Sequence, residues 1–394
     1  MSGRTEPHKC SFLNKRRDWR SRSAAAEIAI FPARWPAVTF LGEMSPVPAH
    51  FPEESGRFCR FFTGWPVLWR KDHDGSVEVR MTSVQPRLLL FSMTLLAYGL
   101  VFTLARAVGI AVDYASILKF CAILVPVFGA AIAYSAFRRM EPMRVALECI
   151  LCGLLLTVPV GLCTYLAMGA NFPLADERLV RMDAALGFDW RGFIRFVDAF
   201  PLLAEGLAQA YQSFALQLLG IPVLLAAFGR YTRCYAMVLG YGLICFVSSL
   251  ISVWYPALGA YSVYGVAPQS LDHINVYFGF AFLEQFHAVR SDPDFVFSFA
   301  RMMGIVTFPS VHAAVALLCA WAMWDIRLLR YPFLVLNTMM AVSAVSHASH
   351  YLVDVIAGIG IASVTISSVC FLCNLRVREP VSTSTAGMAL LNKS

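Results

Sequence analysis

The strongest constraint on the fold is a set of apolar runs, each about as long as a helix that crosses a bilayer. Such a helix needs about 20 mostly apolar residues. Eight runs of this kind are present, at residues 88–108, 114–136, 145–168, 202–228, 234–254, 311–326, 332–348 and 351–373. Backbone groups in lipid must be hydrogen-bonded within the protein, and runs of this length suit helices. The sequence therefore predicts an all-α, polytopic membrane protein with about eight transmembrane helices.

The distribution of arginines indicates the orientation of these helices. Only 14% of the 394 residues are charged, and the formal net charge is +7. The arginines gather in short loops, at 137–144, 229–233 and 325–330, and in the tail from residue 376. All four segments fall on one side of the bilayer, and the positive-inside rule places that side in the cytoplasm. We therefore expect both termini in the cytoplasm of a cell inner membrane protein and no nucleic-acid partner.

Two segments on the opposite side are too long to be simple turns. Residues 169–201 carry apolar side chains at helical spacing with charges between them, which suits a helix lying at the membrane surface. Residues 255–309 form the second segment, and long loops of this kind are usually functional. We expect chemistry-bearing residues near these two segments.

The first chemical motif is "TFPSVHAA", residues 307–314, where the sixth apolar run begins. Proline suits the first position of a helix, so the motif predicts a helix start near Pro309. The free N–H groups and the dipole at a helix start favour anions. Ser310 adds a hydroxyl donor, and His312 can protonate a leaving oxygen. This combination indicates a site for a phosphate ester.

The second motif is "SHASHYLVDVIAG", residues 346–358, on the same predicted side of the membrane. His350 and Asp354 are four residues apart, so on one helix they would share a face. The carboxylate would then orient the imidazole and leave its other nitrogen free as a nucleophile. A metal site remains an alternative, because His347, His350 and Asp354 could all act as ligands. The spacing alone does not choose between these two readings.

Taken together, "FPSVHAA" and "HYLVDVIAG" resemble the second and third motifs of the type 2 phosphatidic acid phosphatase (PAP2) superfamily. They are most similar to its branch related to inositol phosphorylceramide synthase. The close likeness spans roughly residues 300–360, and a looser one extends back to "LADERLVRMDAALGFDW" at 174–190. The resemblance implies a six-helix catalytic core, a phosphohistidine at His350, support by Asp354, protonation by His312 and phosphate binding by Ser310. It implies no cofactor and no metal requirement.

The composition, the apolar runs and the resemblance together predict a division of the chain. Residues 1–87 are polar and basic, and we expect them to be disordered, with Met81 as an alternative start of translation. Residues 88–144 would form two additional transmembrane helices. The PAP2-like catalytic domain would occupy 145–373, and 374–394 would form a cytoplasmic tail.

The chain departs from the family pattern where cations are expected. The stretch 252–265 has neither Lys nor Arg, although the first family motif supplies both there, and Ala344 stands where the third motif usually has Arg. We therefore expect Arg290 and Arg301, in the loop before "FPSVHAA", to bind the phosphate. The arginines of the surface segment, Arg178, Arg181, Arg191 and Arg195, are the next candidates.

These observations predict an integral membrane phosphatase or phosphotransferase that acts on a phosphorylated lipid from the outer face. The branch resemblance favours transfer to a polyol such as inositol. Plain hydrolysis of a lipid phosphate is the close alternative. A transporter or non-catalytic lipid-binding protein is the alternative of another class, and Glu148 and Gln217, which lie inside predicted spans, are the residues that would support it.

Overall fold

The computed structural model describes residues 85–373 and Leu375, and these residues form an all-α polytopic membrane protein. Six of their helices are long and apolar enough to cross a membrane: α2 (Pro86–Val108), α3 (Tyr114–Phe137), α4 (Glu141–Gly169), α7 (Pro201–Ala227), α8 (Tyr231–Ser252) and α14 (Leu352–Leu372). The predicted start at Met81 and nearly all of the predicted N-terminal region and tail lie outside the described residues. The first helix begins slightly earlier than expected, at Pro86.

The remaining two predicted spans form shorter or more polar helices. Helix α12 (Val311–Met323) has 13 residues, which at about 1.5 Å per residue gives roughly 20 Å. The hydrocarbon core of a bilayer is about 30 Å thick. Helix α13 (Arg330–His347) carries Asn337, Ser343, Ser346 and His347, all buried, which lower its hydropathy. Six of the eight predicted spans therefore meet both the length and the hydropathy of a membrane-crossing helix.

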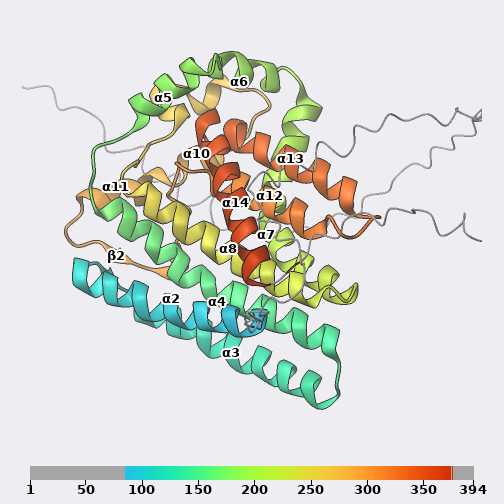
Figure 1. Ribbon diagram of the computed structural model, residues 1–394. Helices are drawn as coiled ribbons and strands as arrows, with labels where there is room; N and C mark the ends of the chain where they lie inside the picture. Colours follow the sequence, from blue (N-terminus) through green and yellow to red (C-terminus); the bar gives the residue numbers. More distant parts are fainter. Residues whose placement is uncertain (1–84, 374, 376–394) are drawn as a thin grey trace, which may run out of the picture. The chain divides into compact units, whose positions relative to one another are not determined.

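Helices α4, α7, α8, α12, α13 and α14 pack against one another and form the bundle that carries the two motifs. Helix α12 lies inside this bundle and contacts α7, α8, α13 and α14. Helices α2 and α3 pack along α4, away from the motifs (Figure 1). The two additional N-terminal helices thus extend the bundle on one side.

The three arginine-bearing loops meet at one end of the bundle. Arg233 at the start of α8 donates to Asp325 Oδ2 at 2.6 Å, which joins the loop before α8 to the loop before α13. Arg144, in the first turn of α4, and Thr232, at the start of α8, both line one small cavity. The starts of these two helices therefore lie close together. We call this the arginine-rich end.

Two polar side chains inside the predicted spans, Glu148 and Gln217, are hydrogen-bonded to neighbouring helices. Glu148 of α4 accepts from Arg87 Nε at 2.8 Å and from the hydroxyl of Tyr235 at 2.5 Å. The Gln217 side-chain oxygen accepts from Asn337 Nδ2 at 2.8 Å, between α7 and α13. These contacts give both residues a role in holding helices together.

The two long segments gather at the other end of the bundle, where α14 begins. Residues 169–201 form two helices, α5 (Asp176–Ala185) and α6 (Trp190–Asp198), which lie across the bundle end in Figure 1. Residues 255–309 form short elements: α9 (Ala260–Tyr264), η1 (Pro268–Ser270), α10 (Tyr277–Phe280), α11 (Leu283–Ser291), β2 (Val296–Phe297) and η2 (Phe299–Arg301). Strand β2 pairs in parallel with β1 (Ala111–Val112). We call this the His350 end.

Candidate active site

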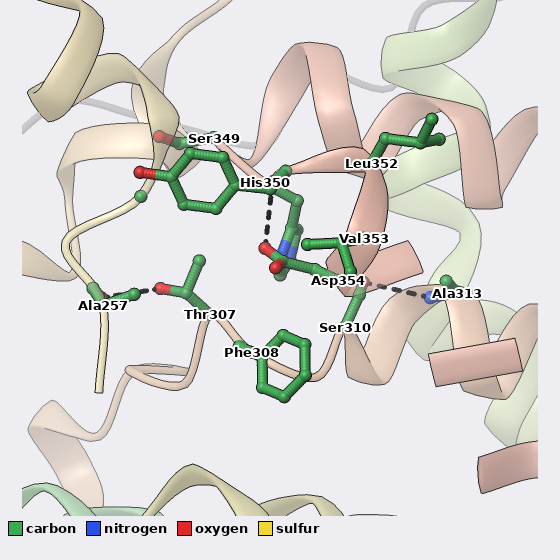
Figure 2. A network of polar contacts seen from close by, with 12 residues as sticks. Ala257, Thr307, Phe308, Ser310, Ala313, Ser349, His350, Leu352, Val353 and Asp354 are labelled. Carbon is green, nitrogen blue, oxygen red and sulfur yellow. Dashed lines mark hydrogen bonds and ion pairs between the residues drawn. The ribbon is translucent and has the colours of Figure 1, made fainter. Parts of the chain in front are cut away.

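His350 and Asp354 form a hydrogen-bonded pair at the start of α14. Nδ1 of His350 lies 3.1 Å from Oδ2 of Asp354, and both side chains are buried (Figure 2). The same carboxylate oxygen accepts from the Tyr351 N–H at 2.9 Å. An ionised carboxylate only accepts hydrogen bonds, so beside it Nδ1 carries the hydrogen. The lone pair of Nε2 is then available for attack, and no hydrogen bond engages Nε2 within the described part of the chain.

The pair is assembled by a turn and not by one helix. Helix α13 ends at His347 and α14 begins at Leu352, so His350 lies between them. Ser349 adopts a left-handed conformation with φ of 63°. Its carbonyl accepts from Ala260 N at 2.7 Å and its hydroxyl accepts from Tyr261 N at 2.8 Å. This tie to the loop after α8 holds His350 in place.

Gly259 makes that close approach possible. Its φ is 88°, and a Cβ added there would overlap the Ser349 side chain and carbonyl. Any larger residue at 259 would therefore push the His350 turn away from the loop.

The two sequence motifs meet through backbone hydrogen bonding. The N–H of Ser310 donates to the carbonyl of Asp354 at 3.0 Å. Helices α12 and α14 touch here, because a Cβ at Gly358 would overlap the carbonyl oxygen of Ser310. The residues of both motifs thus lie side by side, as Figure 2 shows.

Ser310 is the N-cap of α12, and the helix begins at Val311, two residues later than the prediction from Pro309. The Ser310 hydroxyl accepts from the Ala313 N–H at 3.4 Å and is buried. An accepting hydroxyl keeps its own hydrogen, which leaves a donor beside the helix start. The predicted helix start is present, with Ser310 as its cap.

His312 lies in the first turn of α12, where its ring packs against aromatic side chains of α7. The ring stacks on Tyr211 with centroids 4.2 Å apart, and Phe214 lies 4.5 Å away. Stacking occupies the faces of the imidazole and leaves the nitrogens at its edge. Neither nitrogen forms a hydrogen bond with any described residue.

The two arginines expected to bind phosphate lie elsewhere. Arg290 of α11 donates to the Phe172 carbonyl at 2.8 Å and to the Met168 carbonyl at 3.4 Å. It thereby satisfies backbone oxygens at the end of α4, and burial lowers the pKa of its guanidinium. Arg301 is exposed on η2, which packs against α3. The recorded contacts thus bind the Arg290 guanidinium to the end of α4, and neither arginine forms a hydrogen bond with His350 or Asp354 among the described residues.

Three residues of the surface segment hold the pair, and the motif reasoning missed them. Asp183 accepts from the N–H groups of Leu352 and Val353, each at 2.9 Å. Asp176 accepts from the Tyr351 hydroxyl at 2.9 Å, and Trp190 Nε1 donates to the His350 carbonyl at 3.2 Å. Burial raises the pKa of Asp183, and its two N–H donors oppose that rise.

A sequence signal for the two aspartates does exist. Asp176, Leu179 and Asp183 lie on one face of α5, and all three are buried. Carboxylates that recur on the apolar face of a surface helix, seven residues apart, suggest buried acceptors.

The alternative metal set is not assembled. His347 Nδ1 contacts the Ser346 hydroxyl at 2.9 Å, whereas His350 turns to Asp354. Among residues 85–373 and 375, no group of three His, Cys, Asp or Glu is placed to hold a metal ion. The histidine–aspartate contact is thus a pair in the described structure.

Comparison with known proteins gives a family match over this region. Residues 177–368 match a family model described as the PAP2 superfamily. The match contains both motifs and most of α5, and it begins after α4. No curated protein and no solved structure matches the chain.

Proposed function

We propose that this protein is a membrane phosphoesterase that acts on a phosphorylated lipid through a phosphohistidine at His350. One observation carries the proposal: Nδ1 of His350 lies 3.1 Å from the Asp354 carboxylate, which leaves the lone pair of Nε2 free for attack. The match to the PAP2 superfamily over residues 177–368 supports a lipid phosphatase type of activity.

In the proposed first step, Nε2 of His350 attacks phosphorus and the phosphorus–oxygen bond to the lipid alcohol breaks. His312 gives a proton to the departing oxygen, and Asp354 stabilises the positive charge on the His350 ring. The start of α12, with about half a positive charge, and the Ser310 hydroxyl bind the phosphate oxygens. In the second step an acceptor oxygen attacks phosphorus, the nitrogen–phosphorus bond breaks, and His312 takes the acceptor's proton.

For the acceptor we propose a polyol such as inositol, with water as the alternative. The support is the likeness of "FPSVHAA" and "HYLVDVIAG" to the synthase-like motifs. The protein is purified and given a labelled phospholipid with and without inositol. A labelled inositol phosphate product supports transfer. Free phosphate or headgroup phosphate in equal amounts under both conditions identifies water as the acceptor.

The residues inside the spans favour an enzyme over a transporter. Glu148 and Gln217 are each hydrogen-bonded to a neighbouring helix, whereas transport sites usually keep polar groups available near the bilayer centre.

We further propose that the arginine-rich end faces the cytoplasm and the His350 end the outer side. Labelling of single exposed cysteines placed in the 229–233 loop and in α6, from outside intact cells, tests this orientation.

The replacement His350→Ala tests the central proposal. We expect turnover of phosphatidic acid to fall by about a thousandfold or more, because the nucleophile is removed. Acid quenching of the unaltered enzyme during turnover should trap a labelled phosphohistidine that the variant lacks. His287→Ala is the matched control, because His287 is exposed on α11. Normal turnover by the His350 variant would refute the mechanism.

We expect the enzyme to stay active in a chelator, because the proposed nucleophile is a side chain. Loss of activity in the chelator that added metal restores would favour the alternative metal site.

A further inference from the structure

A cavity of about 500 Å³ lies beside the candidate site, between the end of α4, the start of α5 and the end of α8. It is lined by Phe172, Pro173, Arg178, Ile251, Trp254 and Tyr255. Five of these side chains are apolar or aromatic and one is a cation. The catalytic residues proposed above do not line it.

The walls of the cavity are tied together. The Ala175 N–H donates to the Pro256 carbonyl at 2.8 Å, which joins the segment after α4 to the segment after α8. The rings of Phe172 and Trp254, which both line the cavity, meet edge to face with centroids 6.5 Å apart. Arg290 fixes the Phe172 carbonyl at 2.8 Å. The cavity is therefore part of the fold and does not depend on one mobile side chain.

Arg178 supplies the positive charge of this cavity. The other arginines of the surface segment have partners: Arg181 lies 4.0 Å from Glu177, and Arg191 donates to the Tyr264 carbonyl at 2.7 Å. Over the described ranges, 85–373 and 375, Arg178 makes no hydrogen bond or ion pair with another side chain. Its guanidinium is thus available to an anion.

The position of the cavity points to a lipid. It lies where two membrane-crossing helices, α4 and α8, end, and such ends meet the bilayer interface. Trp254 is 52% exposed and Phe172 is 41% exposed, so the apolar wall is open to the surroundings of the protein. Aromatic side chains of this kind favour the headgroup level of a bilayer. A cation beside an open apolar wall matches a phosphate attached to hydrocarbon chains.

The cavity also shares a wall with the first motif. The ring of Tyr255 lies 5.1 Å from that of Phe308, and the Ser252 hydroxyl donates to the Phe308 carbonyl at 2.7 Å. Thr307 donates to the Ala257 carbonyl at 2.9 Å, as Figure 2 shows. A residue that lines the cavity, Tyr255, therefore contacts the segment that leads into Ser310.

We propose that this cavity binds a phosphorylated lipid that enters sideways from the bilayer, with Arg178 bound to its phosphate and the aromatic wall against its chains. A guanidinium can hold two phosphate oxygens at once, which an ammonium cannot match. Resting on the proposed function, this assigns Arg178 as the substrate-binding cation that the family positions lack. The cavity is the place where the lipid docks beside the His350 end.

Binding is measured without turnover, through the fluorescence of Trp254. The full-length protein is placed in nanodiscs of phosphatidylcholine, and phosphatidic acid with brominated chains is added. We expect quenching that Trp254→Phe removes. Arg178→Ala should weaken this binding about tenfold, and Arg178→Lys less, because a charge-assisted bidentate contact is lost. Arg181→Ala is the control, since Arg181 lies one turn from Arg178 on α5 and is 70% exposed.

Two further ligands separate a lipid site from a phosphate site. Brominated diacylglycerol, which lacks the phosphate, should quench Trp254 weakly in every variant. Inorganic phosphate at millimolar concentration should not displace the lipid. Equal quenching by diacylglycerol, displacement by inorganic phosphate alone, or unchanged binding in Arg178→Ala would each overturn the proposal.

The same variants separate this inference from the proposed function. Arg178-dependent binding without any phosphate release would support the cavity and refute the enzyme. Phosphate release with unchanged KM in Arg178→Ala would support the enzyme and refute the cavity as its substrate site. If both proposals hold, KM for phosphatidic acid rises in Arg178→Ala.

Discussion

The two ends of the bundle use carboxylates in different ways. At the arginine-rich end they pair with guanidinium groups: Glu148 with Arg87 at 2.7 Å, and Asp325 with Arg233 at 2.6 Å. At the His350 end they accept backbone N–H groups, as Asp183 does from Leu352 and Val353. The first arrangement joins helices to one another. The second shapes loops and helix starts, and it leaves arginines such as Arg178 without an internal counterion.

This difference follows from what each end must do. A carboxylate that binds two N–H groups holds the backbone in a defined position without bringing in a positive charge. A guanidinium paired with a carboxylate is already neutralised and attracts a phosphate weakly. The comparison therefore predicts that substitutions at the arginine-rich end lower the stability of the protein. Substitutions at the His350 end should lower its activity.

The largest effect is expected at the arginine-rich end, from Arg87→Ala. The side chain of Glu148 is 1% exposed, so this change leaves a buried carboxylate without its cation. Breaking a buried pair in this way costs about 3–5 kcal/mol. Glu148→Gln should cost less, because Arg87 is 42% exposed and can turn to water. Thermal unfolding in detergent measures both. Equal costs would contradict the assignment of Glu148 as the buried partner.

A smaller effect, seen in activity, is expected from Asp183→Asn. An amide oxygen can accept one of the two N–H groups, but the amide NH₂ opposes the other. The start of α14 then shifts with Asp354, and small misplacements of this kind cost between about tenfold and a hundredfold in rate. The loss should appear in kcat, with KM unchanged.

Glu177→Gln is the matched control for Asp183→Asn, since the Glu177 side chain is 91% exposed on the same helix. The dependence of kcat on pH should keep its shape in the Asp183 variant. The substitution displaces His350 and Asp354 but leaves both residues present. A variant with unchanged kcat would show that the α14 start holds its position without Asp183.

The smallest effect is expected at Asp198, which holds a loop at the His350 end. Burial raises its pKa, but N–H groups of Asp272, His273 and Ile274 outweigh this, and the pKa lies below its ordinary value. The contribution to stability is therefore present above about pH 3.9, the ordinary pKa. It is lost as pH falls through the lower, folded-state value.

Hydrogen exchange measures this loss at the amides of residues 273 and 274. Their protection, corrected for intrinsic rates, should fall on going from pH 5 to pH 3 in the unaltered protein. Asp198→Asn should show weaker protection that no longer depends on pH. A pH-dependent loss of the same size in the variant would assign it to another group.

Local spacing predicted what local geometry decides. His350 and Asp354 are four residues apart, and the prediction that they bond assumed one helix; the contact is present although His350 lies in the turn before α14. Ser310 and His312 were placed at a helix start because Pro309 marks one, and the helix begins two residues later. Contacts within a few residues are encoded in the order of the chain.

The residues that support the His350–Asp354 pair, and the arginine proposed to bind phosphate, depend on packing between segments far apart in the sequence. Asp183 binds backbone N–H groups, which any residue supplies, so no partner side chain in the sequence points to it. Arg290 precedes Ser310 by twenty residues. Its position in the chain does not show that its guanidinium donates to the Phe172 carbonyl, just after α4. The predicted span 311–326 extends three residues beyond Met323, where α12 ends, so hydropathy overstated the length of that helix.

The contact at Gly358 has a consequence for motion. Because α12 and α14 meet there without an intervening side chain, a tilt of one helix displaces the other. The Ser310 N–H and the Asp354 carbonyl, 3.0 Å apart, are therefore carried as one body. Any opening and closing that accompanies a catalytic cycle has to occur in the parts that rest on this body, such as α5, α6 and the loop around Gly259. The residues proposed to react with the substrate therefore lie on the rigid pair α12 and α14, and substrate access depends on movement of the surface segments.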